Sequence, residues 1–114
     1  MEIQFNETQD GIREIKLTGT FDITGTGQIE NKFSGYCAGE KPLVLVNLSE
    51  VDFLASIGIR LLVLTAKSVA SRGGKMVLLA PIPEVFRVLE ITGIPSIIPI
   101  YSQTESAKAV LLAP

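Results

Sequence analysis

The serine at position 56 is the residue whose type and position best suit chemistry. It lies in the stretch DFLASIGIRLLVL, residues 52–64, where an apolar strand is followed by an amphipathic helix. A serine just before such a helix is typical of an N-cap, whose hydroxyl oxygen accepts a hydrogen bond from a backbone N–H group. The same position lies beyond the carboxyl end of a buried strand, where α/β sheets place their binding sites. Ser56 is therefore either a helix cap or a functional residue.

The residues that usually carry catalysis are few. The chain contains no histidine and a single cysteine, Cys37, so a zinc site and a histidine-dependent hydrolase lack their usual groups. Its 12 Asp and Glu residues are scattered, and neither a Ser-x-x-Lys nor a Gly-x-Ser-x-Gly pattern occurs. We expect a protein with no catalytic site, metal or cofactor, and a buried or half-buried Cys37.

Two glycine-rich stretches, GTGQ at 25–28 and RGGK at 72–75, resemble nucleotide-binding loops only superficially. The first lacks the third glycine of the dinucleotide-binding fingerprint. The second precedes a strand and lacks the spacing of a phosphate-binding loop. We predict that both stretches are turns.

Size and charge exclude several classes of protein. A chain of 114 residues with 46% hydrophobic residues suits one domain, residues 1–114, with a substantial core. The net charge of -2 and the scattered basic residues argue against nucleic acid binding. The first residues lack the pattern of a secretory signal, and no apolar run is long enough to span a bilayer. We expect a cytoplasmic protein without membrane insertion.

Hydrophobic periodicity predicts the elements that position Ser56. Two alternating strands separated by an Asp-Gly turn read as a hairpin, and PLVLVNLS at 42–49 reads as a central strand buried on both faces. The helix at 57–71 has apolar residues at the i, i+3, i+4, i+7 spacing. The other strands are predicted at 2–6, 12–18, 76–80 and 97–100. The other helices are predicted between Asp22 and Tyr36, from Pro83 to before Gly93, and after Ser102 or Thr104.

The predicted fold class is α/β. The strand, helix and strand that surround Ser56 form a crossover unit whose two strands should be parallel. We expect a mixed sheet of four to five strands with about four helices mainly on one face. Ala107, Val110 and Leu111 should point inward from the last helix. Tyr101 and this apolar helix could instead form a homodimer surface, with core packing as the alternative.

The order of several stretches gives a resemblance that covers nearly the whole chain. They are GTFDI at 19–23, LVLVNLSEVDFLASIGIRLLV at 43–63, GGKMVLLAP at 73–81, VFRVLEITGIPSIIPIY at 85–101 and ESAKAV at 105–110. Together they resemble a STAS domain of the bacterial anti-sigma factor antagonist family. The resemblance implies a STAS-like α/β fold and a protein that binds partners without catalysis of its own.

The resemblance also implies a switch. In regulatory members, the unphosphorylated antagonist captures an anti-sigma factor that is also a serine kinase, which frees the sigma factor. Phosphorylation of a serine at the start of the second helix blocks capture, and Ser56 falls on that serine. Asp22 matches the family's acid after the second strand. The expected partner surface comprises Asp22, Thr24, Ser56, Ile57, Gly58 and Arg60.

Two departures from the family motif keep alternatives open. The phosphorylatable form reads Asp, then Ser, then Ser or Thr, then Gly, whereas this chain reads Ala55-Ser56-Ile57-Gly58. The missing acid favours an alternative in which the domain is a scaffold or transport-associated module that binds its partner constitutively. A second alternative is a small-molecule or nucleotide-binding STAS domain. For Gly58, close approach of a partner and packing inside the domain are equally open.

Overall fold

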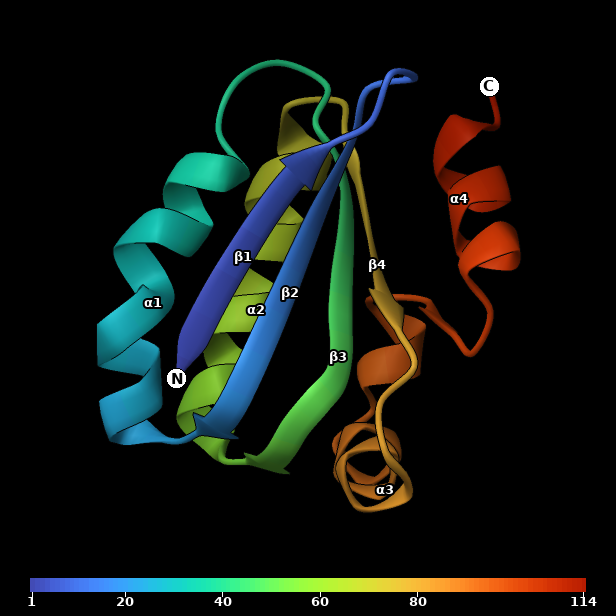
Figure 1. The fold of residues 1–114 in the computed structure, drawn as a ribbon. Coiled ribbons are helices and arrows are strands. Elements are labelled where there is room, and N and C mark those ends of the chain that lie inside the picture. Colours follow the sequence, from blue (N-terminus) through green and yellow to red (C-terminus); the bar gives the residue numbers. More distant parts are fainter.

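Five strands form one mixed sheet in the order β1-β2-β3-β4-β5 (Figure 1) in the computed structural model, which describes residues 1–114. The first two strands are antiparallel, and every later neighbour pair is parallel. This arrangement confirms the predicted mixed sheet and the parallel strands on either side of the Ser56 helix. The strands are β1 (Glu2–Glu7), β2 (Ile12–Phe21), β3 (Leu43–Leu54), β4 (Lys75–Leu79) and β5 (Ile100–Tyr101).

The helices cover the two faces of the sheet unequally. A core cluster of 20 buried residues joins one face of the sheet to the first three helices, whereas a cluster of six lies on the other face under the last helix. The predicted excess of helices on one face is therefore confirmed. The helices are α1 (Ile23–Tyr36), α2 (Ser56–Ser71), α3 (Pro83–Ile91) and α4 (Thr104–Leu112), with a 3-10 helix, η1 (Ile94–Ser96).

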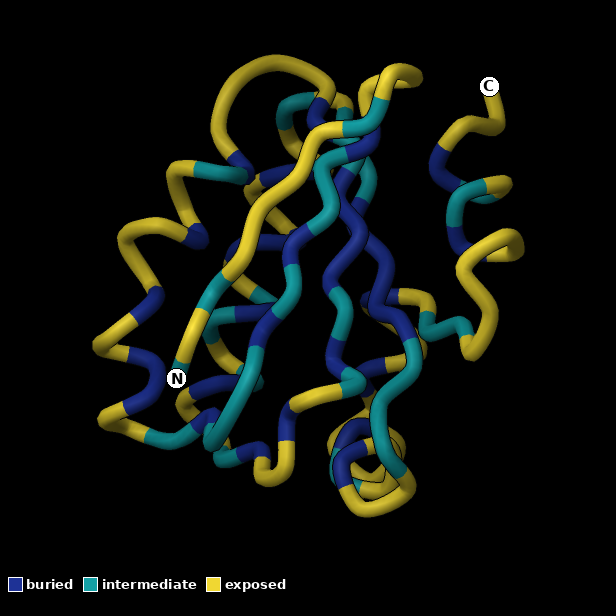
Figure 2. The backbone as a smooth tube through the Cα atoms, in the orientation of Figure 1, coloured by how far each residue is buried: buried dark blue, intermediate teal, exposed yellow.

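The middle of the sheet is buried on both faces because successive side chains of a strand point to opposite sides. In β3, Val44 and Val46 belong to the larger cluster and Leu45 to the smaller one. The central strands are accordingly dark in Figure 2, whereas β1 at the edge is mostly exposed. In α4, Ala107 and Leu111 are buried against the sheet, which confirms core packing for these two residues.

Both strands that lead into the predicted site are longer than the sequence indicated. β2 extends to Phe21 rather than residue 18, and β3 extends to Leu54 rather than residue 49. Register shifts interrupt the pairing of β2 with β3, which then continues to the pair Phe21 and Leu54. The prediction was short because the apolar alternation is broken at these irregularities, while backbone pairing persists through them.

The stretch GTGQ is not a turn, so this prediction was wrong. Residues 25–28 lie in the first half of α1, which Asp22 caps. A β-carbon added to Gly25 would lie 2.0 Å from the carbonyl oxygen of Thr20. Glycine is therefore required there by close packing of the helix against the end of β2, not by a change of chain direction.

The strand predicted at 97–100 begins later and is shorter. η1 ends at Ser96, residues 97–99 are in no strand, and only Ile100 and Tyr101 pair with β4. Pro95 and Pro99 lack the N–H group that a strand ladder needs, which limits pairing to the two residues that follow them. The predicted turn at RGGK, by contrast, is confirmed between α2 and β4.

Candidate functional site

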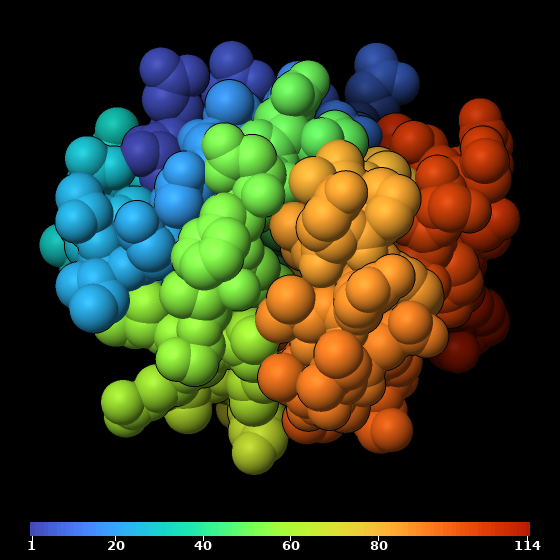
Figure 3. All heavy atoms as spheres, turned by 90° about the horizontal axis from the view of Figure 1, so that it is seen from below, coloured from blue at the N-terminus to red at the C-terminus, as the bar shows by residue number.

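The parallel pairing of β2 and β3 brings Asp22 and Ser56 to the same edge of the sheet. Phe21 and Leu54 are register partners, and the N–H of Ala55 donates to the carbonyl oxygen of Phe21 at 2.9 Å. The residues that follow this pair begin α1 and α2. Viewed from this edge, the start of α1, the end of β3 and the start of α2 form one continuous surface, with α3 beside it (Figure 3).

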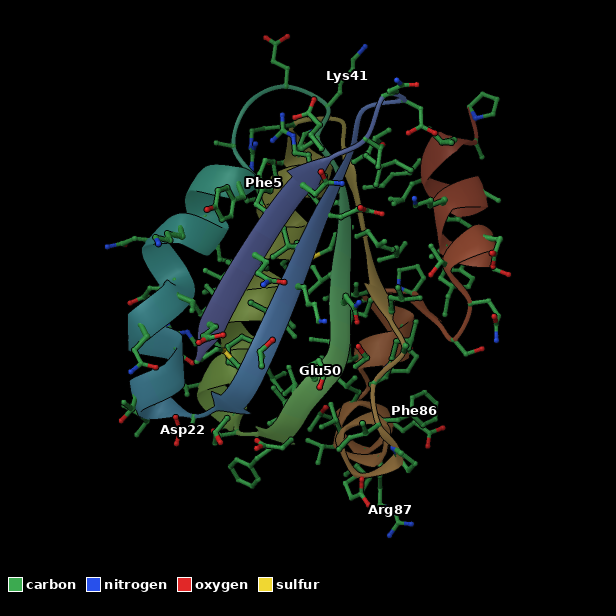
Figure 4. The ribbon with its side chains drawn as sticks, viewed as in Figure 1. Phe5, Asp22, Lys41, Glu50, Phe86 and Arg87 are labelled. Carbon is green, nitrogen blue, oxygen red and sulfur yellow. The ribbon has the colours of Figure 1, made fainter.

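Asp22 is the N-cap of α1. Its Oδ1 atom accepts a hydrogen bond from the N–H of Gly25 at 2.8 Å, which satisfies one of the free donors of the first turn. Figure 4 shows Asp22 at this end of α1. Thr24, in the same turn, is exposed. The two residues are thus held next to the start of α2.

Ser56 is not the cap of α2, so the cap interpretation was wrong. Ala55 occupies the N-cap position with an extended backbone and makes no side-chain hydrogen bond, and Ser56 is the first helical residue. Ala55 takes the N-cap position because β3 is longer than predicted, with pairing that continues to the residue before Ala55. The Ser56 side chain is exposed, and its hydroxyl group makes no hydrogen bond within the chain.

Gly58 lies beneath the surface rather than on it. An added β-carbon would lie 2.7 Å from Cδ1 of Phe21 and 3.0 Å from Cδ1 of Leu54. Phe21 is fully buried, so its ring has little room to move. Of the two alternatives for this glycine, the structure supports packing, and Gly58 does not present itself to a partner.

A shallow groove of about 470 Å³ runs between α1 and α2 and contains two of the other predicted site residues, Ile57 and Arg60. Half of the residues that line it are hydrophobic, and the others include one acidic and one basic side chain. The lining residues are Ile23, Thr26, Gly27, Glu30, Ile57, Arg60, Leu61 and Leu64. Ile57 and Arg60 therefore belong to a surface that suits binding of a protein segment.

Comparison with known proteins identifies the fold and family. The sequence profile of the STAS domain matches residues 6–107. The chain belongs to the STAS domain family. BtrV of Bordetella bronchiseptica, whose name places it among the anti-sigma factor antagonists, is 30% identical over 100 residues, which cover 88% of this chain and 86% of BtrV. Within the family, this STAS domain thus groups with the anti-sigma factor antagonists.

Solved structures agree. An anti-sigma factor antagonist STAS domain protein from Planctomyces limnophilus superposes with a TM-score of 0.84 at 25% identity, covering 97% of this chain and 98% of that one. The Bacillus protein SpoIIAA has the same fold in its unphosphorylated form, with a TM-score of 0.76 at 22% identity, covering 96% of each chain. Its phosphorylated form gives 0.70 at 21% identity, covering 96% of this chain and 99% of that one.

Two exposed apolar residues beside Ser56 were missed from the sequence of this STAS domain. Ile23 is 75% exposed and Phe53 is 55% exposed. A signal was present for Ile23, because it lies off the helical spacing of the buried residues Ile29 and Phe33. Phe53 was hidden because β3 was predicted to end before it. Together they extend the apolar part of the groove surface around the start of α2.

The charges of this STAS domain's site are sparse. Arg60 is exposed and takes part in no salt bridge or hydrogen bond. Asp52 accepts a hydrogen bond from Oγ1 of Thr20 at 3.0 Å. No group of three or more acidic, cysteine or histidine side chains is placed to hold a metal ion, and none of the helices is long and apolar enough to cross a bilayer. The site therefore offers a partly apolar surface on which Arg60 and Glu30 carry opposite charges without forming an ion pair.

Proposed function

We propose that this STAS domain is an anti-sigma factor antagonist of the cytoplasm that binds an anti-sigma factor kinase through the surface around Ser56. Phosphorylation of Ser56 ends that binding and so regulates sigma-factor-dependent transcription. The proposal rests above all on the Ser56 hydroxyl group, which is exposed, unpartnered and next in the chain to Ile57, a lining residue of the groove between α1 and α2. The relatives named as anti-sigma factor antagonists support the class of partner.

The position of Ser56 suits a phosphate chemically. A kinase would form a bond between Ser56 Oγ and the γ-phosphorus of ATP, break the bond from that phosphorus to its bridging oxygen, and release ADP and the hydroxyl proton. The product carries about -1.5 to -2 charges. Because Ser56 begins α2, the helix dipole favours this anion by roughly 0.3 to 1 kcal/mol. The fold should therefore survive modification.

The same phosphate opposes docking of a partner. Ile23 and Phe53 are exposed beside Ser56, and Ile57 lies in the groove. A partner that covers these apolar side chains must also remove the doubly charged phosphate from water, which is costly. Binding would be lost although the domain stays folded. Asp22 and Thr24, at the start of α1, complete the proposed surface.

A constitutive scaffold or transport-associated module is the second candidate. It is favoured by Ala55, which stands where the phosphorylatable motif has an acid. In this case the same groove would bind a partner regardless of Ser56. The two candidates differ in one measurable property, the response of binding to charge at Ser56.

A capture experiment tests the proposal. The wild-type protein, Ser56→Ala and Ser56→Asp are immobilised, exposed to native lysate, and the retained proteins identified by mass spectrometry. We expect wild type and Ser56→Ala to retain a kinase-like anti-sigma factor and Ser56→Asp to lose it. Purified partner with ATP should then phosphorylate wild type but not Ser56→Ala.

Ser106→Asp provides the matched control. It adds the same charge to the first turn of another helix, α4, where Ser106 is exposed on the opposite side of the sheet. Capture by this variant should equal that of wild type. Equal retention of one partner by all four proteins would instead support the constitutive module, and retention of no anti-sigma factor would contradict the proposal.

A further inference from the structure

Arg60, a cation of the site that forms no ion pair, lies one helical turn after Ser56. Residues four apart on a helix share a face, with about 5–6 Å between their β-carbons. Ser56 and Arg60 are both exposed on α2, and the Arg60 guanidinium makes no hydrogen bond or salt bridge. A long, free cationic side chain thus lies within reach of any group attached to the Ser56 oxygen.

We propose that Arg60 binds the phosphate of phosphorylated Ser56 and is thereby withdrawn from the groove between α1 and α2. This inference rests on the proposed function, because it describes how the modified state differs from the unmodified one. It assigns Arg60 two alternative contacts. In the unmodified protein its side chain lines the groove, and in the modified protein it pairs along its own helix.

The chemistry favours this pair. A guanidinium group presents a planar set of donors that matches phosphate oxygens, and such charge-assisted hydrogen bonds are stronger than neutral ones. The order of charges is also favourable, because an anion N-terminal to a cation at i, i+4 agrees with the helix dipole. Pairing within one helix requires no movement of the backbone.

Neighbouring carboxylates do not compete strongly for Arg60. Glu30 lines the same groove from α1 but forms no salt bridge with it. Asp22 is engaged with the N–H of Gly25, and Asp52 with the hydroxyl group of Thr20. Withdrawal of Arg60 leaves Glu30 as the one charged side chain of the groove. The groove would change from balanced to acidic, which disfavours a partner that places a carboxylate there.

The test uses protein with phosphoserine incorporated genetically at position 56, so that no kinase is needed. The second pKa of the phosphate is measured by ³¹P NMR titration in wild type and in Arg60→Gln. A nearby cation favours the dianion, so removal of Arg60 should raise the phosphate pKa by about half a unit. The phosphate pKa in Arg60→Lys should fall between these two values, because lysine keeps the positive charge but lacks the planar set of donors of the guanidinium group.

Lys67→Gln is the matched control. It removes a cation from the same helix at an exposed position about 16 Å from Ser56 along the axis, which is beyond the screening length of about 8 Å at physiological salt. Its phosphate pKa should equal that of wild type. Equal pKa values in wild type and Arg60→Gln would overturn the inference.

The two proposals can fail separately. If the capture experiment shows no response to charge at Ser56, the proposed function fails, while the titration still reports whether Arg60 binds the phosphate. If the titration shows no effect of Arg60 but capture responds to Ser56→Asp, the switch stands and acts without the arginine.

Discussion

The two ends of the layer formed by α1 and α2 are built in opposite ways. At the end away from Ser56, arginines from other elements bind the carbonyl groups that follow α1. At the Ser56 end, a hydroxyl group, an arginine and apolar side chains are left without partners. Figure 4 labels Asp22 at the Ser56 end and Lys41 in the loop between α1 and β3 at the other end.

The first end is held by two guanidinium groups. Arg13 of β2 donates to the carbonyl oxygens of Tyr36 and Ala38, and Arg72 after α2 donates to those of Cys37 and Gly39 at 2.9 and 2.6 Å. Carbonyl groups at a helix end lack partners within the helix, so these bonds stabilise the fold directly. Burial raises the pKa of the Cys37 thiol to about 11 despite both arginines.

At the Ser56 end, hydrogen bonds within the chain hold the starts of the two helices. Asp22 caps α1, and Ala55 bonds to Phe21. Ser56, Arg60 and the exposed Phe53 contribute no contact of this kind. Residues that bind a partner must keep their polar or apolar groups free in the unbound protein. Residues that stabilise the fold instead make their contacts within the chain. The comparison supports the proposed binding surface, because the hydrogen-bonding and apolar groups that remain free gather at the Ser56 end.

The largest expected effect comes from Gly58→Ala, which would break the packing under the Ser56 end. The new β-carbon would lie within 3.0 Å of buried Phe21 and Leu54 side-chain atoms, and overpacking of this kind costs about 1–3 kcal/mol. Urea unfolding followed by circular dichroism measures the loss, since the chain has no tryptophan. In Gly27→Ala, where an added β-carbon meets nothing within 4 Å, stability should rise by up to about 1 kcal/mol. Unchanged stability of Gly58→Ala would contradict the packing role.

A smaller effect is expected from Arg72→Ala at the opposite end. Loss of the guanidinium leaves the carbonyl oxygens of Cys37 and Gly39 without these donors, and we expect the free energy of unfolding to fall by about 1–2 kcal/mol. Partner capture should be unchanged at a temperature where the variant is folded. Lys67→Ala, which removes an exposed cation of α2, should leave both stability and capture unchanged. A loss of capture in folded Arg72→Ala would show that the two ends are not functionally separate.

The smallest effect is expected from Ser56→Ala. Because its hydroxyl group makes no hydrogen bond, the free energy of unfolding should change by less than about 0.5 kcal/mol. Asp22→Ala is the comparison, since removal of a true cap costs about 1 kcal/mol. Thermal or urea unfolding of the two variants under the same conditions measures both losses in the free energy of unfolding. A loss in Ser56→Ala as large as that in Asp22→Ala would restore the cap interpretation.

Much of the fold could be predicted from local pattern. The hairpin, the buried strand at 42–49, the helix after Ser56 and the last helix each follow from a hydrophobic period and a start or stop residue, which act over neighbouring positions. The positions of Ser56 and Asp22 were also predictable, because both lie where strands give way to helices. The predicted turn at 25–28 and the predicted strand at 97–100 differ from the structure. Both stretches lie at or beside glycine or proline, whose effect depends on what packs against the backbone.

By itself, the sequence determined the α/β class, the order of most elements and the position of Ser56 along the chain. Only the tertiary structure decided that β2 and β3 run together to Phe21 and Leu54, which places Asp22 beside Ser56. It also decided that Ala55 is the cap, that Gly58 is buried and that Ile23 and Phe53 are exposed. The physical reason is that strand register and helix packing depend on residues distant in the sequence, whereas periodicity and capping signals report only on neighbours.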